Sequence, residues 1–243
     1  MLLINGVTGS LGVATLKLAS EKGIRTVGVG RNSSKLSKLN KEYSEIDFFQ
    51  VDDVSSEEEA KHLLEQIESV ANEKIELYLH AAAILNRTKS PLETSVENFE
   101  ETLKVNLTGT FIWNKAIMGK MIENKVHGSL LNVASQAART GGFGGTTSYA
   151  ASKGGMVSLS KSFARFGALH NIRVNSISPG FLDNPMMLEG LTSDQIAEFT
   201  GRTALKRLAT NNEIAEVCLF LLGSGASYIT GENIEVSAGQ VLG

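Results

Sequence analysis

Tyr149 and Lys153 stand four positions apart, which on a helix places a phenol and an ammonium on one face. A free tyrosine has a pKa of about 10, and a nearby cation favours the phenolate and brings that pKa closer to neutral pH. Such a phenol can donate a proton to a carbonyl oxygen during reduction, or accept one from an alcohol during oxidation. The pair therefore predicts proton transfer beside a hydride donor.

Ser135 precedes this pair and follows the apolar run 129–134, which we predict to be a strand. Ligands of open α/β sheets bind beyond the carboxyl ends of the strands. The Ser135 hydroxyl would then donate to the substrate oxygen as negative charge develops there. A helix cap or a turn residue is the alternative role for this serine.

Glycines at positions 6, 9 and 12 follow a short strand at Leu2–Ile4 and open a helical pattern. In this context one glycine turns the chain sharply, one lets the backbone approach a pyrophosphate, and one lets the helix pack on the strand. The amino terminus of the helix then faces the phosphate charge. We therefore predict that the chain binds a dinucleotide.

The end of the second predicted strand bears on the choice of dinucleotide. An acidic residue about 20 positions after the glycines would bind the ribose 2′-hydroxyl of NAD, but the sequence there is Val29-Gly30-Arg31-Asn32. Arg31 is suited to a 2′-phosphate through a charge-assisted contact. We predict a preference for NADP(H), with NAD(H) and an ordinary exposed arginine as the alternative.

These residues need a scaffold, and the hydrophobic pattern predicts one. Strand-like runs occur at 2–4, 26–29, 47–51, 76–79, 129–134, 173–178 and 233–236, and they alternate with helical patterns that include 55–72, 96–124, 149–168 and 213–222. Such alternation implies parallel strands with crossover helices on both faces. We predict an α/β Rossmann fold: one doubly wound, seven-stranded domain over residues 1–243.

Composition narrows the class further. The 243 residues are 42% hydrophobic and 20% charged, with a net charge of −3, so nothing draws the chain globally to nucleic acid or anionic membrane. No apolar run approaches the roughly 18 residues of a membrane span, and no signal peptide is visible. The single cysteine, Cys218, is expected in a buried helix. We expect a cytoplasmic protein without a metal.

The chain resembles the short-chain dehydrogenase/reductase family over essentially its whole length. The glycine turn, Asn106, Ser135, the Tyr149/Lys153 pair, and the segments 173–180 and 231–239 occur in the order and approximate spacing of the family. Together these motifs are highly specific. The resemblance implies a single-domain enzyme that moves hydride between a nicotinamide cofactor and a carbonyl or alcohol.

The resemblance also implies a role for each matching residue. Tyr149 would be the general acid/base, Lys153 would hold the nicotinamide ribose and lower the tyrosine pKa, Ser135 would polarise the substrate oxygen, and Asn106 would anchor a water linking Lys153 to a proton relay. Asp53 would meet the adenine. The full set of expected cofactor-binding residues is Gly6, Thr8, Gly9, Ser10, Leu11, Gly12, Arg31, Asp53, Ala81, Ala82, Tyr149, Lys153, Pro179, Gly180, Phe181, Leu182 and Asn184.

Three positions depart from the family pattern. The glycine spacing resembles that of extended members, which need roughly 100 further residues for a substrate lobe; we keep the shorter architecture. His80-Ala81-Ala82-Ala83 stands where the family has Asn-Asn-Ala-Gly, and we expect His80 to be buried with its hydrogen bonds satisfied rather than catalytic. Asn184 replaces a threonine, and its amide is expected to contact the nicotinamide carboxamide.

The resemblance finally suggests a substrate lid at about 183–201 and a homo-oligomer, a dimer or tetramer, built on the helices at 96–124 and at Tyr149. The predicted function is an NADP(H)-dependent ketone or 3-oxoacyl-type reductase, or the reverse alcohol dehydrogenase. Two alternatives are an NAD-dependent epimerase or dehydratase, and a non-catalytic dinucleotide-sensing regulator.

Overall fold

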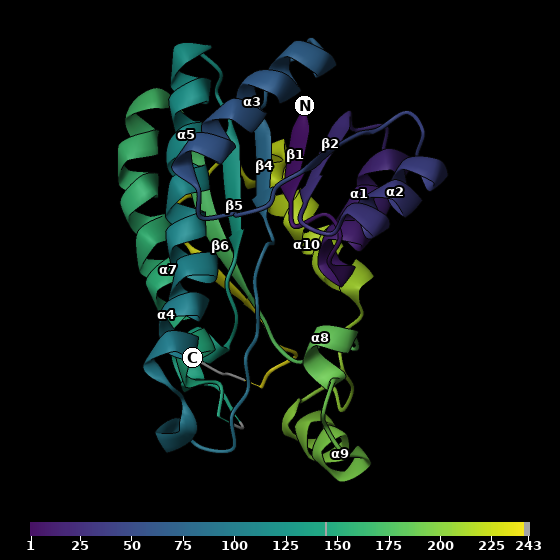
Figure 1. Cartoon of the computed structure of the whole chain (residues 1–243), viewed down its shortest axis with the longest axis vertical. Coiled ribbons are helices and arrows are strands. Elements are labelled where there is room, and N and C mark those ends of the chain that lie inside the picture. Colours follow the sequence, from purple (N-terminus) through teal and green to yellow (C-terminus); the bar gives the residue numbers. More distant parts are fainter. Residues whose placement is uncertain (144, 241–243) are drawn as a thin grey trace.

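A computed structural model describes residues 1–143 and 145–240; Gly144 and residues 241–243, which belong to the predicted domain, lie outside the described part. Seven strands form one sheet in the order β3-β2-β1-β4-β5-β6-β7 (Figure 1), and every neighbouring pair is parallel. The strands are β1 Leu2–Asn5, β2 Thr26–Gly30, β3 Asp47–Gln50, β4 Leu77–His80, β5 Ser129–Val133, β6 Arg173–Pro179 and β7 Asn233–Val236. The predicted seven-stranded α/β Rossmann fold is confirmed.

Helices cover both faces of the sheet, as Figure 1 shows. One face carries α3 Glu57–Ala71, α5 Gly109–Glu123 and α7 Thr147–Gly167; the other carries α1 Ser10–Glu21, α2 Ser33–Glu42 and α10 Asn211–Leu222. Every residue of β1 and β2 is buried, which explains why these strands are continuous apolar runs without polar alternation.

The helix α2 is not predicted by the hydrophobic pattern. Leu36 and Leu39 are its only buried residues, and lysines and serines make up most of the rest. Its amino terminus is capped by Asn32, whose side chain accepts a hydrogen bond from the Lys35 backbone N–H at 2.9 Å. The Asn32 cap and a narrow stripe of buried leucines are enough to form α2, although its hydrophobic periodicity is weak.

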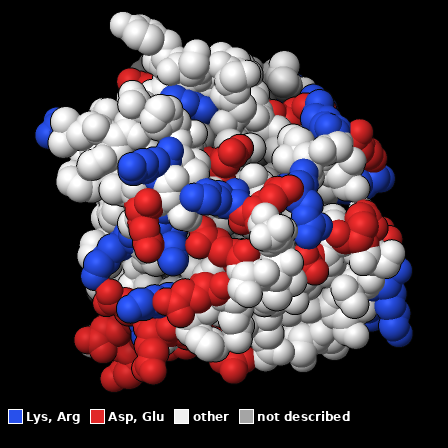
Figure 2. Space-filling view, turned by 90° about the horizontal axis from the view of Figure 1, so that it is seen from above, with Lys and Arg blue, Asp and Glu red and all other residues white. Residues whose placement is uncertain are grey.

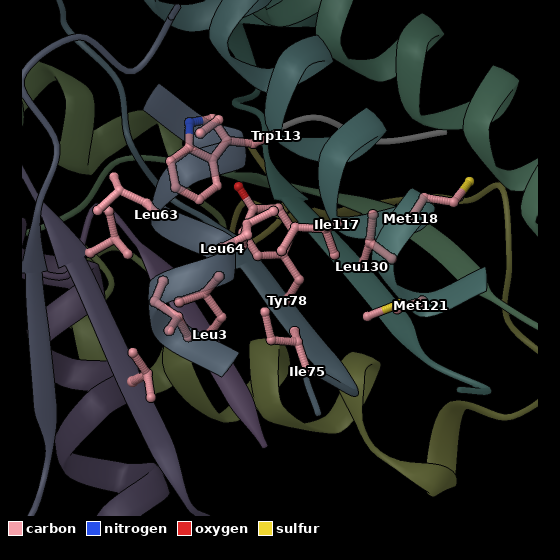
Figure 3. Packing of buried hydrophobic residues seen from close by; sticks show 14 of the residues in the cluster. Leu3, Leu63, Leu64, Ile75, Tyr78, Trp113, Ile117, Met118, Met121 and Leu130 are labelled. Atoms are coloured by element: carbon pink, nitrogen blue, oxygen red, sulfur yellow. The ribbon is translucent and has the colours of Figure 1, made fainter. Parts of the chain in front are cut away.

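An aromatic pair anchors the core beneath the α3–α5–α7 layer. The rings of Tyr78 and Trp113 stack with 6.4 Å between centroids, and leucines and isoleucines of the surrounding elements enclose them (Figure 3). The Trp113 indole N–H donates to the Val54 carbonyl at 3.1 Å, so the buried donor is satisfied. This packing fixes α5 against the central strand β4.

The long helix predicted over 96–124 is interrupted. It divides into α4 Val96–Leu103, a π-helical turn at Lys104–Thr108, and α5. Single π-helical turns inside longer helices are often found at functional sites. This turn contains Asn106, so the interruption bears directly on the site described below.

The carboxyl edge of the sheet lies toward the bottom of Figure 1, where α8 Pro185–Leu188 and α9 Ser193–Arg202 extend beyond β6; the short α6 Ala137–Thr140 follows β5. The view in Figure 2 is from the opposite end, and there basic and acidic side chains are interspersed. Among the described residues, no helix is both long and apolar enough to cross a bilayer.

Candidate active site

A cavity of about 850 Å³ opens at the carboxyl edge of the sheet. Its walls bring together most of the residues predicted from sequence: Gly9, Ser10, Leu11, Gly12, Ala81, Ser135, Tyr149, Lys153, Pro179, Gly180, Phe181, Leu182 and Asn184. The predicted residues outside this lining are Gly6, Thr8, Arg31, Asp53, Ala82 and Asn106. The proton-transfer groups and the residues Gly9–Gly12 of the glycine turn thus share one cavity.

Tyr149 lies in the first turn of α7 and lines the cavity. Burial raises the pKa of its phenol, while the hydrogen-bonding Ser135 hydroxyl and the charge of Arg87 both lower it. The Lys153 Nζ lies 5.5 Å from the centre of the Tyr149 ring. The predicted phenol–ammonium pair is therefore spatially close, and a second cation acts on the same phenol.

Lys153 is 2% exposed, and its Nζ donates to the Val133 carbonyl at 2.6 Å. Burial lowers its pKa to about 7, because an ammonium is poorly stabilised away from water. The expected lowering by Lys153 is not among the influences on the pKa of Tyr149, which come from burial, the Ser135 hydroxyl and the charge of Arg87.

Asn106 lies behind the cavity and is completely buried. Its Oδ1 accepts from the Ile84 N–H at 2.8 Å, and its Nδ2 donates to the Ile84 carbonyl at 2.9 Å and to the Ser152 hydroxyl at 3.1 Å. The Thr110 hydroxyl donates to the Asn106 carbonyl at 2.6 Å. Asn106 thereby connects the loop after β4 with the helix that carries Tyr149.

The glycine turn has the geometry of a phosphate cradle. Gly6 has φ +89°, and a Cβ there would lie 2.5 Å from the Ala82 nitrogen, so a larger residue would collide with the loop after β4. Among the described residues, no side chain caps α1, whose first residues line the cavity, and the first turn of α1 carries no acid. An uncapped amino terminus with open backbone donors fits the pyrophosphate of a dinucleotide.

Three of the predicted cofactor-binding residues, Arg31, Asp53 and Asn184, differ in their exposure and hydrogen-bond partners. Arg31 is exposed at the end of β2. Asp53 bonds to the Ser55 hydroxyl and accepts from Lys104 at 2.9 Å, and these partners hold its pKa at about 2. Asn184 lines the cavity, but its Oδ1 accepts from the Met187 N–H at 3.0 Å, which caps α8.

His80 is fully buried, as predicted. Its Nδ1 pairs with the Tyr78 hydroxyl at 2.7 Å, but its Nε2 lacks a hydrogen-bond partner among the described residues. The expectation that both ring nitrogens are satisfied is therefore wrong. Burial, reinforced by the nearby Lys153, lowers the pKa of His80 to about 3, so the ring is uncharged at neutral pH.

Two features of the cavity were missed in the sequence. Arg87 lines it from the loop after β4; its position beyond the carboxyl end of a strand was the available signal. An aromatic cluster of Phe143, Phe181 and Phe199 also lines it, with Phe181 and Phe199 stacked at 4.4 Å between centroids. These three residues are far apart in the sequence, and only the tertiary structure brings their rings together.

Comparisons with known proteins agree with this architecture. The family described as enoyl-(acyl carrier protein) reductase matches residues 6–240. The 3-oxoacyl-[acyl-carrier-protein] reductase FabG of Aquifex aeolicus is 31% identical over 98% of this chain and 86% of its own length. The human (3R)-3-hydroxyacyl-CoA dehydrogenase is 32% identical over 78% of this chain and 72% of its own length.

A solved structure gives the same result in three dimensions. A short-chain dehydrogenase from Bacillus anthracis superimposes with a TM-score of 0.89 and 26% identity, covering 100% of this chain and 96% of its own. The chain therefore belongs to the short-chain dehydrogenase/reductase family. It is an oxidoreductase that interconverts CH–OH and C=O groups with a nicotinamide cofactor.

Proposed function

We propose that this protein is an NADP(H)-dependent reductase of 3-oxoacyl-type substrates. The observation that carries the proposal is one cavity that joins Ser135, Tyr149 and Lys153 to the uncapped amino terminus of α1 and to an apolar wall. That wall includes the cluster of Phe143, Phe181 and Phe199 and the methionines of α8. It suits the apolar part of an acyl substrate, in keeping with the 3-oxoacyl reductases among the relatives.

Each polar residue has a chemical task in this proposal. Ser135 donates to the substrate carbonyl and stabilises the charge that develops on its oxygen. Tyr149 transfers a proton to that oxygen. Lys153 holds the cofactor ribose and, when charged, favours the phenolate. The bound NADPH supplies the hydride. Asn106 keeps the loop after β4 fixed against α7.

Other residues would bind the cofactor. The backbone of the turn from Gly6 to Gly12 would hold the pyrophosphate, Asp53 the adenine, and the segment 179–184 the nicotinamide. Arg31 lies exposed where no acid stands, which supports a contact with the 2′-phosphate of NADP(H) over the 2′-hydroxyl of NAD(H).

We also propose that residues 1–243 act as one catalytic domain with a lid at about 183–201, that the protein is cytoplasmic, and that it forms a homo-oligomer. A shallow groove supports the last point. It is lined by Leu107, Phe111, Gly155 and Leu159 on the faces of α5 and α7 and the turn before α5, and Phe111 is 43% exposed.

The test is NADPH oxidation against a panel of 3-oxoacyl thioesters and simple ketones. We expect turnover to be fastest with the thioesters. A Tyr149→Phe variant should bind NADPH normally and lose turnover by orders of magnitude. Undiminished turnover in this variant contradicts the assigned acid, and NADPH binding without turnover of any carbonyl compound by the wild type favours the regulator alternative.

A further inference from the structure

Arg87 reaches from the loop after β4 to the lid, across 100 residues of sequence. Its Nη1 donates to the Glu189 carbonyl at 2.8 Å, and its Nη2 donates to the Met187 carbonyl at 2.7 Å. The Met187 sulfur lies 3.7 Å from the same Nη2. One guanidinium thus binds two backbone carbonyls at the end of α8, a geometry that the planar arrangement of its donors favours.

Hydrogen bonds hold the backbone on both sides of Arg87 in place. Asn106 holds Ile84 by two hydrogen bonds on one side of Arg87. On the other side, Thr88 donates from its backbone N–H to the Gly145 carbonyl at 3.1 Å. A Cβ at Gly145 would collide with the Thr88 carbonyl, so these two segments touch closely. Arg87 therefore extends from a rigid loop.

The segment that Arg87 contacts is much less anchored. Neither α8 nor α9 contains a buried residue. The ring of Phe199 packs α9 against Phe181 and Phe143, but the segment as a whole has less apolar packing than the core helices. Asn184 joins the start of α8 to Asn211 through a hydrogen bond of 3.2 Å. The two bonds from Arg87 lie at the other end of α8, and they span the cavity.

The same guanidinium acts on the proposed catalytic acid. Arg87 and Tyr149 both line the cavity, and the charge of Arg87 lowers the pKa of Tyr149. The other charged residues in the lining are Lys89, Glu93 and Lys153. Burial leaves Lys153 with a pKa of about 7, and His80 behind it is neutral, whereas an arginine remains charged.

We propose that Arg87 is a positioning residue that ties the lid across the cavity and, in that closed position, holds its positive charge beside the Tyr149 phenol. Lid closure and proton transfer are thereby coupled through one side chain. When the lid opens, the guanidinium loses two carbonyl acceptors and is free to move away from the phenol. The proposal rests on the function proposed above for Tyr149.

The first test follows the phenol directly. The chain has four tyrosines, so labelling tyrosine Cζ with ¹³C gives four NMR signals, and Tyr149→Phe identifies that of Tyr149. In full-length Arg87→Gln, the signal of Tyr149 should titrate at a higher pH than in the wild type. Arg87→Lys, which keeps the charge, should titrate closer to the wild type. An unchanged titration in Arg87→Gln overturns the proposal.

Arg202→Gln is the matched control. This second arginine, at the end of α9, lies over the ring of Phe143, a residue of the cavity wall, at 4.6 Å from its centroid. It pairs with Glu198, makes no hydrogen bond to the carbonyls of α8 in the described structure and is not among the groups that shift the pKa of Tyr149. Its variant should leave the Tyr149 signal unchanged. A shift equal to that of Arg87→Gln would show a general effect of removing charge and would contradict a specific role.

The second test follows the lid by hydrogen exchange. Peptides covering 185–191 should exchange several-fold faster in Arg87→Gln than in the wild type, with Arg87→Lys in between because its ammonium cannot bridge both carbonyls as the guanidinium does. Equal protection in all three proteins overturns the tie between Arg87 and the lid. A matched urea midpoint confirms that Arg87→Gln is folded.

Turnover separates this proposal from the proposed function. For alcohol oxidation at neutral pH, which requires the phenolate, kcat/KM in Arg87→Gln should fall about three- to tenfold, with less effect at high pH. If the wild type turns over no carbonyl or alcohol, the proposed function fails, while the NMR titration and exchange still test the coupling. If turnover is normal but the titration does not move, the coupling alone fails.

Discussion

Asn106→Ala should strongly destabilise the protein and slow its reaction. The substitution removes the two hydrogen bonds to Ile84 and the one to Ser152. At about 1 kcal/mol net for each bond, the free energy of unfolding should fall by about 3 kcal/mol. Unfolding temperatures of chains of this size fall by about 2–4 °C per kcal/mol, so a decrease of about 6–12 °C is expected.

Asn114→Ala is the matched control. Asn114 lies on α5, close in sequence to Asn106, and both side chains are completely buried. Neither amide atom of Asn114 finds a hydrogen-bond partner among the described residues, so this substitution removes a desolvated polar group that gains nothing from the fold. The volume deleted is the same in both variants. The free energy of unfolding of Asn114→Ala should therefore stay close to that of the wild type.

Urea unfolding followed by circular dichroism measures both values, and NADPH oxidation measures the functional cost. Only Asn106→Ala should lose turnover, because it releases the loop that positions Arg87. Losses of stability within about 1 kcal/mol of each other would refute the reasoning, since they would show that the deleted volume, not the hydrogen bonds, sets the cost.

Three further outcomes are expected. Arg31→Ala should raise the KM for NADPH about tenfold or more and leave that for NADH nearly unchanged; equal changes for both cofactors argue against a 2′-phosphate contact. Lys153→Met should raise the urea midpoint at pH 6 while abolishing turnover. Burial lowers the pKa of Lys153 from 10.5 to about 7 in the folded protein, so burying its charge destabilises the fold. This destabilisation is complete below pH 7 and fades as the pH rises toward 10.5. A lower midpoint would contradict this. Cys218 is fully buried, and burial raises its pKa to about 12, so Ellman's reagent at pH 8 should label it only after unfolding; rapid labelling of the native protein would be the opposite result.

The alternation of strands and crossover helices along the chain was predictable because the strands are short, mostly apolar runs, fully buried in β1 and β2, and parallel connections have few solutions. Element ends shifted by one or two residues. The π-helical turn at Lys104–Thr108 was not predictable, because a hydrophobic period that continues from 96 to 124 does not distinguish it from an α-helix. The helix α2 escaped prediction because it buries only Leu36 and Leu39.

Some residues of the candidate site could be predicted from the sequence, and others could not. Tyr149 with Lys153, and the glycine turn, are visible because their spacing within one element already implies their proximity. Arg87 depends on a contact with Met187 that only the tertiary structure creates. Within the part of the chain that the structure describes, the Nε2 of His80 has no partner. This and the low pKa of Lys153 arise from burial, which a residue type alone does not reveal.

The central claim is that this cavity transfers hydride from a nicotinamide to a carbonyl carbon while Tyr149 supplies the proton. Its most direct test is to supply NADPH deuterated at C4, on each face in turn, with a 3-oxoacyl thioester and to analyse the product by mass spectrometry. We predict one deuterium on the carbinol carbon with one of the two labelled faces, in the wild type but not at a comparable rate in Tyr149→Phe. A reduced product without deuterium from either face would contradict the account.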